Sequence, residues 1–328
     1  MDRSYCIAPM MGRTDSQFRH LIRLISKKTV LFTEMIHSNA ILYGNKNKLE
    51  EYSNIENPIV LQIGGNDPKN LGKVSKLANK FNYDEINLNL GCPSPRVSSG
   101  GFGAALMNNP ELVKDCLFSI KENFNKEVSV KIRLGTDDND IDKTLDDFVD
   151  TIQSCNIKVF YVHARKAILK GLTPKQNLNI PKLNYGMVYE IKKSNPDLEI
   201  IINGGVTATE QIKKHLNFCD GVMIGRAIYQ NPYFLKDIEN DIFGNSNILS
   251  REDIVKKILE YLENEIKSGT KVNQVMRHTV GLYYGQPGSK GWKKYLSDNM
   301  MARDSDFQKA KHIMSIAQNN EKANQLTI

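Results

Sequence analysis

The chain has 328 residues, of which 40% are hydrophobic and 25% are charged, and its net charge is +7. This composition excludes wholesale disorder, collagen and coiled coil, and the length predicts one large domain or one large and one small domain. No apolar run approaches the roughly 18 residues that a membrane span needs. The first residues carry no apolar stretch of signal-peptide length before Pro9. We therefore expect a cytoplasmic protein that needs no membrane.

Short apolar runs and helical patterns alternate through the first 225 residues. Most of the runs are rich in Val and Ile, as expected for strands buried on both faces of a parallel sheet. The eight runs are Tyr5–Ala8, Val30–Thr33, Ile59–Ile63, Glu85–Leu88, Val128–Ile132, Val159–Val162, Glu199–Ile202 and Gly221–Ile224. The helical patterns between them are Asp15–Ser26, Pro68–Lys80, Asn109–Lys121, Ile141–Gln153, Tyr185–Lys193 and Thr209–Leu216.

Eight strands alternating with helices predict an α/β fold of the (β/α)8 TIM-barrel type. A doubly wound sheet is the competing architecture, but its G-x-G-x-x-G fingerprint is absent from the sequence. After Gly244 the strand signal stops and only helical patterns follow, which indicates a small all-helical C-terminal domain. We expect the barrel to cover residues 1–243 and the helical domain 244–328. The helical patterns are Glu252–Lys267, Val272–Leu282, Trp292–Met301 and Phe307–Ala317.

The positive charge is concentrated in the C-terminal quarter. Residues 250–328 hold 13 Lys or Arg and 9 Asp or Glu, and the stretch from Lys267 to Lys294 holds six basic residues and no acidic one. Such a run is often only a solvated helix face. Here it is interleaved with Tyr283, Tyr284 and Trp292, a mixture typical of nucleic-acid surfaces. The sequence leaves both interpretations open.

Five scattered cysteines without a C-x-x-C pair argue against disulfides and against a metal site. Four lie in apolar or helical surroundings, whereas Cys92 stands among Asn, Gly, Pro and Ser after an expected strand. A cysteine there can meet a substrate beneath the following loop, Ser98–Gly103. Because an unperturbed thiol has a pKa near 8.5, it is mostly protonated at neutral pH and can donate a proton.

In a barrel the active site lies where the strands end, so polar residues after each apolar run are the candidates. The last two ends, Asn203–Gly205 and Gly225-Arg226, suit a phosphate held by backbone amides and a guanidinium. Lys131 and His163 would face the middle, which fits FMN, although a phosphorylated sugar is not excluded by these residues alone. The other strand-end candidates are Pro9, Met10, Met11, Glu34, Gln62 and the segment Asn87–Cys92.

Taken together, these motifs resemble the tRNA-dihydrouridine synthases. The segments that carry the resemblance are Ala8–Met10, Leu61–Gly65, Glu85–Ser94, Val130–Arg133, His163–Ala167, Asn203–Gly205 and Gly221–Arg226. The continuation of the histidine segment through Gly171-Leu172 and Pro174-Lys175 is similar to the DusA branch. Two positions differ from that branch: Gly12-Arg13 replaces an acidic residue and tryptophan, and Leu178 replaces an arginine.

The resemblance implies an FMN-bound barrel and a helical domain that binds tRNA. NADPH would be a transient reductant of the flavin, which would then reduce the C5=C6 bond of a D-loop uridine near position 20. Hydride from flavin N5 would reach C6, and Cys92 would protonate C5. The implied FMN residues are Pro9, Met10, Met11, Gln62, Lys131, His163, Asn203, Gly204, Gly205, Gly225 and Arg226. The implied tRNA contacts are Asn89, Lys175, Lys290 and Lys293, and no obligate protein partner is expected.

Two other functions remain possible from the sequence. A flavin-dependent reductase of a free pyrimidine or another small enone would explain the barrel and Cys92, but not the basic helical tail. An RNA-binding protein without activity would leave the phosphate-binding glycines, Lys131 and Cys92 without a purpose. RNA-independent turnover would identify the first alternative, and a colourless purified protein would identify the second.

Overall fold

The computed structural model describes residues 1–44, 49, 54–137 and 141–300. The chain divides into two compact units. The first consists of Met1–Gly12 and Lys28–Gly225, and the second consists of Arg13–Lys27 together with the chain from Arg226 onward.

The first unit is a parallel β-barrel. All eight expected runs form strands, and their hydrogen-bonded order is β1-β9-β8-β7-β6-β5-β4-β2. The ring is completed between β1 and β2, where Cys6 and Val30 form a parallel bridge and the Ile7 N–H donates to Val30 O at 2.9 Å. The strands are β1 Tyr5–Ile7, β2 Leu31–Phe32, β3 Ile36–His37, β4 Ile59–Gly64, β5 Glu85–Leu90, β6 Glu127–Arg133, β7 Val159–His163, β8 Glu199–Asn203 and β9 Gly221–Ile224. The expected (β/α)8 fold is confirmed.

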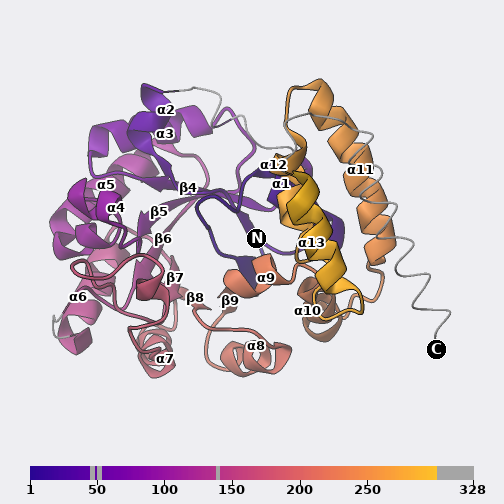
Figure 1. Cartoon of the computed structure of the whole chain (residues 1–328). Coiled ribbons are helices and arrows are strands. Elements are labelled where there is room, and N and C mark those ends of the chain that lie inside the picture. Colours follow the sequence, from indigo (N-terminus) through magenta and orange to yellow (C-terminus); the bar gives the residue numbers. More distant parts are fainter. Residues whose placement is uncertain (45–48, 50–53, 138–140, 301–328) are drawn as a thin grey trace. The chain divides into compact units, whose positions relative to one another are not determined.

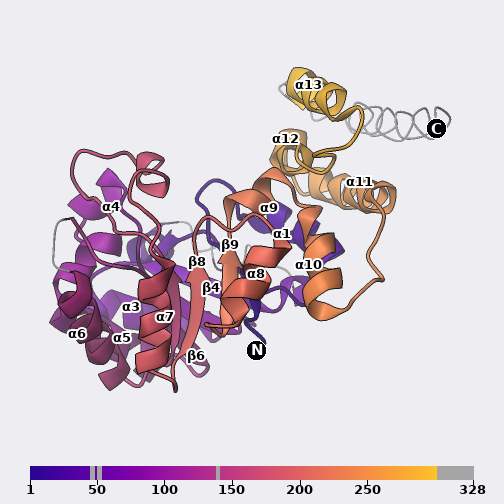
Figure 2. The same ribbon diagram turned by 90° about the horizontal axis from the view of Figure 1, so that it is seen from below.

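Helices surround these strands on the outside (Figures 1 and 2). Several of these helices begin at an N-terminal capping residue that can be recognised in the sequence. Asp67 and Asn109 each accept a backbone N–H with their side chains, and a proline follows each of them at the first helical position. The helices of this unit are α2 Ser38–Leu42, α3 Pro68–Ala78, α4 Pro95–Ser99, α5 Pro110–Asn123, α6 Ile141–Ser154, α7 Tyr185–Ser194 and α8 Thr209–Leu216, with 3-10 turns η2 Asn54–Glu56, η3 Gly103–Asn108 and η4 Gln176–Leu178.

Most strands begin or end one or two residues away from the expected runs. The two-residue strand β3 was not expected, and it pairs with the end of β4. Strand β5 continues to Leu90 rather than Leu88, because Asn89 and Leu90 pair with Lys131 and Ile132 of β6. Asn89 was expected to follow the strand, but it lies within the sheet opposite Lys131.

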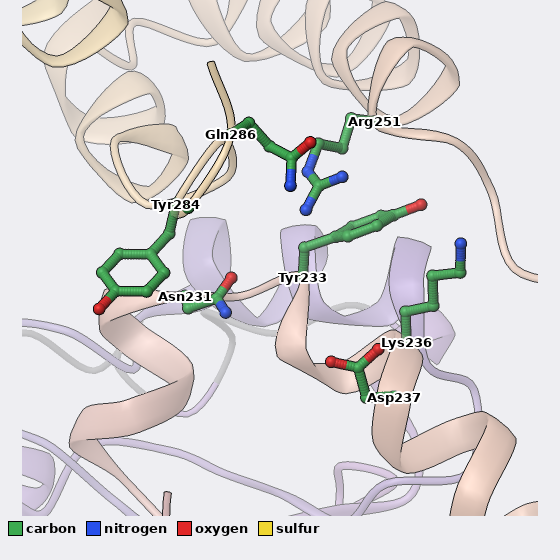
Figure 3. A pocket seen from close by; sticks show the side chains of 8 residues that line it. Asn231, Tyr233, Lys236, Asp237, Arg251, Tyr284 and Gln286 are labelled. Atoms are coloured by element: carbon green, nitrogen blue, oxygen red, sulfur yellow. The ribbon is translucent and has the colours of Figure 1, made fainter. Parts of the chain in front are cut away.

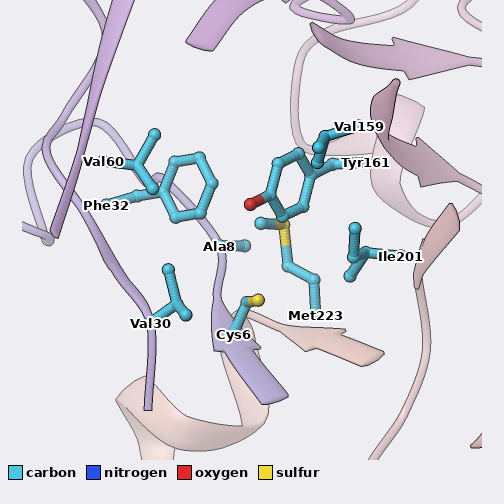
Figure 4. Close-up of a cluster of buried hydrophobic side chains, with 9 residues drawn as sticks. All are labelled: Cys6, Ala8, Val30, Phe32, Val60, Val159, Tyr161, Ile201 and Met223. Atoms are coloured by element: carbon cyan, nitrogen blue, oxygen red, sulfur yellow. The ribbon is translucent and has the colours of Figure 1, made fainter. Parts of the chain in front are cut away.

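Alternate residues of the strands fill the inside of the barrel. Nine buried side chains form one cluster (Figure 4): Cys6, Ala8, Val30, Phe32, Val60, Val159, Tyr161, Ile201 and Met223. The pairs from one strand are two residues apart, as the period of a strand requires. This packing in layers is typical of TIM barrels and makes the interior a solid core.

A buried ion pair closes the end of the barrel where the strands begin. The Arg3 guanidinium donates to the Glu85 carboxylate at 2.6 and 2.9 Å, and also to Glu199 at 2.7 Å. Burial raises the pKa of Glu85, while Arg3 acts in the opposite direction. Since removal of Arg3 would leave the buried Glu85 carboxylate without its cation, this pair fixes the arrangement of the strands where they begin. The functional groups lie at the other end.

The second unit is helical throughout its described part. It contains α1 Ser16–Ile25, α9 Arg226–Gln230, α10 Phe234–Phe243, α11 Arg251–Lys267, α12 Val272–Met276, the 3-10 turn η5 Arg277–Thr279 and α13 Ser289–Met300. Helix α1 was expected among the barrel helices, but it groups with this unit, as do α9 and α10. The pattern at Phe307–Ala317 lies outside the described residues. The division of function at residues 243 and 244 stays a prediction.

Contacts distant in sequence place α1 in the helical unit. Asp15 caps α1 through Phe18 N at 3.0 Å, and its carboxylate also pairs with His278 Nε2 at 2.9 Å. The ring of His20 stacks on Tyr261 of α11, with centroids 3.7 Å apart. Burial of His20 lowers its pKa to about 4, so the ring packs in its neutral form.

The described residues offer no helix that is long and apolar enough to cross a membrane. The described residues also contain no group of three or more His, Cys, Asp or Glu side chains that could hold a metal ion.

Candidate active site

Three of the predicted site residues meet at the ends of neighbouring strands β6, β7 and β8. The sheet register pairs His163 with Asn203, and Lys131 lies on β6 opposite Tyr161 of β7. The Lys131 ammonium donates to Asn203 Oδ1 at 3.1 Å, and Asn203 Nδ2 donates to the carbonyl of Met223 at 2.7 Å. The hydrogen bonds therefore connect β6, β8 and β9 above the apolar core.

Lys131 is a buried cation. Burial and, to a smaller extent, the neighbouring Arg133 lower its pKa to about 7, while Cys92 acts in the opposite direction. Within the described residues no carboxylate pairs with it. A buried charge without a counter-ion is costly, so this position favours a ligand that brings negative charge or accepts a hydrogen bond.

A chain of amides lies beside Lys131. Gln62 Nε2 donates to Asn87 Oδ1 at 2.8 Å, and Asn89 Nδ2 donates to Gln62 Oε1 at 3.0 Å. Asn87 in turn donates to Ser129 Oγ at 2.7 Å. All these side chains are buried. Gln62 and Asn89 were predicted site residues, and the structure brings them together and fixes their orientation.

Asn89 also holds the segment that carries Cys92. Its Oδ1 accepts the backbone N–H of Gly91 at 3.2 Å and that of Cys92 at 3.0 Å. The Cys92 thiol lies 3.6 Å from Ser94 Oγ and is half-buried, whereas the other four cysteines are buried. Cys92 is therefore the one thiol of the five that solvent or a ligand can reach.

The loop that follows Cys92 folds back and contacts the backbone of Cys92. The Ala104 N–H donates to the carbonyl of Cys92 at 3.0 Å. At Gly103, whose φ is +64°, a Cβ would lie 2.7 Å from that carbonyl oxygen. Only glycine permits this conformation together with so close an approach. Residues 95–99 form α4, which includes the first two residues of the loop Ser98–Gly103 expected from the sequence.

Arg133 is a site residue that sequence reasoning did not single out. Its Nε donates to the carbonyl of Gly91 at 2.9 Å, and its Nη1 donates to the carbonyls of Lys166 at 2.8 Å and Asn177 at 3.1 Å. The guanidinium thus ties the Cys92 segment to the loop after β7. Ser129, Lys131 and Arg133 alternate along β6, so a period of two would have placed all three on one face.

The ends of β8 and β9 carry the glycines predicted to hold a phosphate. Gly204 and Gly205 have φ values of +128° and +70°. A Cβ at Gly204 would lie 3.0 Å from His163 Cδ2, and a Cβ at Gly225 would lie 3.3 Å from Met10 Sδ. The predicted residues His163 and Met10 are therefore immediate neighbours of these glycines.

The remaining predicted residues are less enclosed. Pro9 is half-buried and Met11 is 66% exposed after β1, and Lys175 is exposed next to η4. Arg226, Lys290 and Lys293 belong to the second unit, Arg226 at the first position of α9 and both lysines on α13. Arg226 directly follows Gly225, the last residue of the first unit.

A family model described as dihydrouridine synthase (Dus) matches residues 6–320. The chain belongs to the dihydrouridine synthase family. It is 44% identical over 300 residues to the tRNA-dihydrouridine(20/20a) synthase of Shewanella oneidensis, covering 91% of this chain and 89% of that protein. It is 45% identical to the protein of the same name from Synechocystis, with 90% and 89% covered. For the protein of that name from Escherichia coli K12, identity is 42%, with 95% and 91% covered.

A solved structure of a variant of NCR from Zymomonas mobilis matches with a TM-score of 0.49 and 14% identity over 76% of this chain and 88% of that one, a similarity too low to bear on function. For this dihydrouridine synthase family member, the strand-end group is the candidate active site. It combines a buried cation, hydrogen-bonding amides and one accessible thiol.

Proposed function

We propose that this chain reduces uridine in the D-loop of tRNA to 5,6-dihydrouridine, with bound FMN and with NADPH as the transient reductant. The relatives whose names carry the positions 20 and 20a support a target near position 20. The observation that carries the proposal is the hydrogen bond from buried Lys131 to Asn203, beside the segment that presents Cys92.

The residues present fit FMN. Lys131 is a buried cation that lacks a carboxylate partner within the described residues, and a cation near the pyrimidine end of a flavin stabilises its reduced anion. Gly204, Gly205 and Gly225 are proposed to hold the phosphate through backbone N–H groups, and Arg226 through its forked guanidinium. The other residues proposed to hold FMN are Pro9, Met10, Met11, Gln62, His163 and Asn203.

When bound, FMN would supply the hydride for uracil C6. The protein's part is to hold the uracil and to deliver a proton to C5. Cys92 would donate that proton, because its thiol is accessible and its backbone is fixed by Asn89. Asn89 Nδ2 has a second N–H that could meet the uracil. Lys175, Lys290 and Lys293 would contact the tRNA backbone.

The proposal can be tested in cells that lack this protein. Mapping of dihydrouridine in their tRNA should show its loss near position 20 of the D-loop. The wild-type gene should restore it, and Cys92→Ala should not. Unchanged dihydrouridine in every tRNA of the deletion strain would contradict the proposal.

A further inference from the structure

We propose that a pocket of the helical unit binds one unpaired nucleotide of the tRNA, with its base stacked on Tyr284. This inference rests on the proposed function and adds a base-binding site to the lysine contacts proposed for the tRNA backbone. The Tyr233–Tyr284 pocket has a volume of about 400 Å³ and includes Asn231, Tyr233, Lys236, Arg251, Tyr284 and Gln286 in its wall (Figure 3). This volume lies in the range of small-ligand sites.

Tyr284 is presented to solvent by its neighbours in the core. Tyr283 is buried and packs edge-on against Trp292, with ring centroids 5.4 Å apart. Trp292 is itself held by a hydrogen bond from Nε1 to the carbonyl of Thr279 at 3.1 Å. With Tyr283 turned inward, the side chain of Tyr284 is 52% exposed. An exposed ring on a fixed backbone is a stacking platform for a base.

The opposite wall is rigid and cationic. The Arg251 guanidinium lies 3.8 Å above the ring of Tyr233, and its Nε donates to the carbonyl of Leu282 at 2.9 Å. The Tyr233 hydroxyl donates to the carbonyl of Leu249 at 3.0 Å. Both side chains are therefore held in place before any ligand arrives, which reduces the entropic cost of binding.

Two ammonium groups flank this pocket. Lys236 Nζ lies 5.6 Å from the ring centroid of Tyr233, and Lys293 Nζ lies 5.4 Å from that of Tyr284. Asp237 is the one carboxylate of the wall. Two ammonium groups and the Arg251 guanidinium thus outnumber one carboxylate, which favours a ligand that carries phosphate.

Amide side chains in the pocket wall offer hydrogen bonds that suit a base. The Oδ1 atom of Asn231 is buried and has no hydrogen-bond partner. Figure 3 shows the amides of Asn231 and Gln286 pointing into the pocket between the two tyrosines. Asn and Gln side chains hydrogen-bond the edges of bases, and RNA is read chiefly through bases that are not paired with another base.

The first experiment measures binding of unmodified tRNA to the flavin-loaded full-length protein over a series of salt concentrations. Tyr284→Ala should weaken binding by about 5- to 100-fold, the range for loss of one stacked base, and leave the salt slope unchanged. Tyr284→Phe keeps the ring and should bind like wild type. Lys236→Ala should instead reduce the slope by about 0.7.

The matched control is Phe218→Ala. Phe218 is also an exposed aromatic residue (48%), but it stacks on Tyr189 and precedes β9, at the end of the barrel opposite the candidate active site. This variant should bind tRNA like wild type. Wild-type affinity of Tyr284→Ala would overturn the inference, as would equal losses in Tyr284→Ala and Phe218→Ala.

The second experiment identifies the nucleotide by removing single bases from the tRNA. One abasic position in an unpaired region should weaken binding to wild type and have little further effect on Tyr284→Ala. Fully additive losses at every position would contradict a direct contact. If Tyr284→Ala raises the KM for NADPH and leaves tRNA affinity unchanged, the pocket serves the dinucleotide and the inference is wrong.

Failure of the proposed function would look different. In that case wild type would form no dihydrouridine whatever the state of Tyr284. If wild type forms dihydrouridine and only the binding results above are negative, the pocket inference alone fails.

Discussion

Lys131 of β6 and Asn203 of β8 are joined by a hydrogen bond of 3.1 Å across the end of β7. The amide of Asn203 is in turn fixed by the carbonyl of Met223. Asn203 therefore supplies a neutral acceptor to a buried cation, which lowers the cost of burying that cation without neutralising it. Lys131 is therefore suited to pair with an anionic ligand, and its replacement should change both the stability of the protein and the binding of flavin.

Lys131→Met should stabilise the flavin-free protein at pH 7 while weakening flavin binding. A pKa shifted from 10.5 to about 7 corresponds to a penalty of roughly 4 kcal/mol at pH 7. The substitution leaves Asn203 Oδ1 unpaired, which costs about 1–3 kcal/mol. The net gain should be about 1–3 kcal/mol in the free energy of unfolding, measured by denaturant titration. Lys158→Met, at an exposed position, is the control.

The lowered pKa of Lys131 also predicts how the stability difference between Lys131→Met and wild type depends on pH. Between pH 7 and 10.5 the unfolded chain binds more protons at Lys131 than the folded protein does, so the penalty falls as pH rises. It is fully present below pH 7 and absent above 10.5. The stability gained by Lys131→Met should therefore shrink across this window. A pH-independent difference would show that Lys131 is not a buried cation.

Gly204→Ala should reduce FMN content and lower the unfolding midpoint. The left-handed φ strains any side chain, and the new Cβ would lie 2.9 Å from Leu183 Cδ2 and 3.0 Å from His163 Cδ2. Gly135→Ala is the matched control, since its φ is +134° and a Cβ there meets nothing within 4 Å. The excess loss at Gly204 should be about 1–3 kcal/mol, the cost of crowding. Equal effects of the two substitutions would show that crowding against Leu183 and His163 does not restrict position 204.

Cys92→Ala should leave reduction of the flavin by NADPH intact, because no proton is delivered to uracil in that half-reaction. Transfer to tRNA should slow by roughly 10²- to 10⁴-fold, the usual contribution of general acid catalysis. Stopped-flow absorbance follows the first step, and single-turnover product analysis follows the second. Wild-type turnover of tRNA would exclude Cys92 from the mechanism, whereas loss of flavin would indicate a structural role.

Replacement of Lys290, Lys293 and Lys294 with alanine should weaken tRNA binding and flatten its dependence on salt. Each lost phosphate contact should reduce the slope of log K against log salt by about 0.9 for duplex and about 0.7 for single strands. The control replaces Lys69, Lys73 and Lys76, which are exposed on α3. If both triple variants bind alike, the stretch from Lys267 to Lys294 is only a solvated face.

Most of the barrel could be predicted because its signals are local. A run such as Val128–Ile132, which lies between two helical patterns, favours a buried strand, and parallel strands bring their ends to one edge. The assignment of α1 could not be predicted in this way. Its sequence fits either unit, and its place is decided by Asp15 with His278 and by His20 with Tyr261, more than 200 residues apart in the chain.

The candidate site also contains both residues that could be predicted from the sequence and residues that could not. Lys131, His163 and Asn203 could be found from their positions at strand ends. The function of Arg133 could not, since it depends on where the carbonyls of Gly91 and Asn177 lie in space. The Tyr233–Tyr284 pocket likewise combines residues from three separate segments.

The most direct test of the central claim uses purified flavin-loaded protein, NADPH and an unmodified tRNA transcript, with mass spectrometry of the digested product. The account predicts that the tRNA gains two hydrogen atoms per reduced uridine, at D-loop positions near 20, and that free uridine is reduced far more slowly. No dihydrouridine in the tRNA, or equally fast reduction of free uridine, would contradict it.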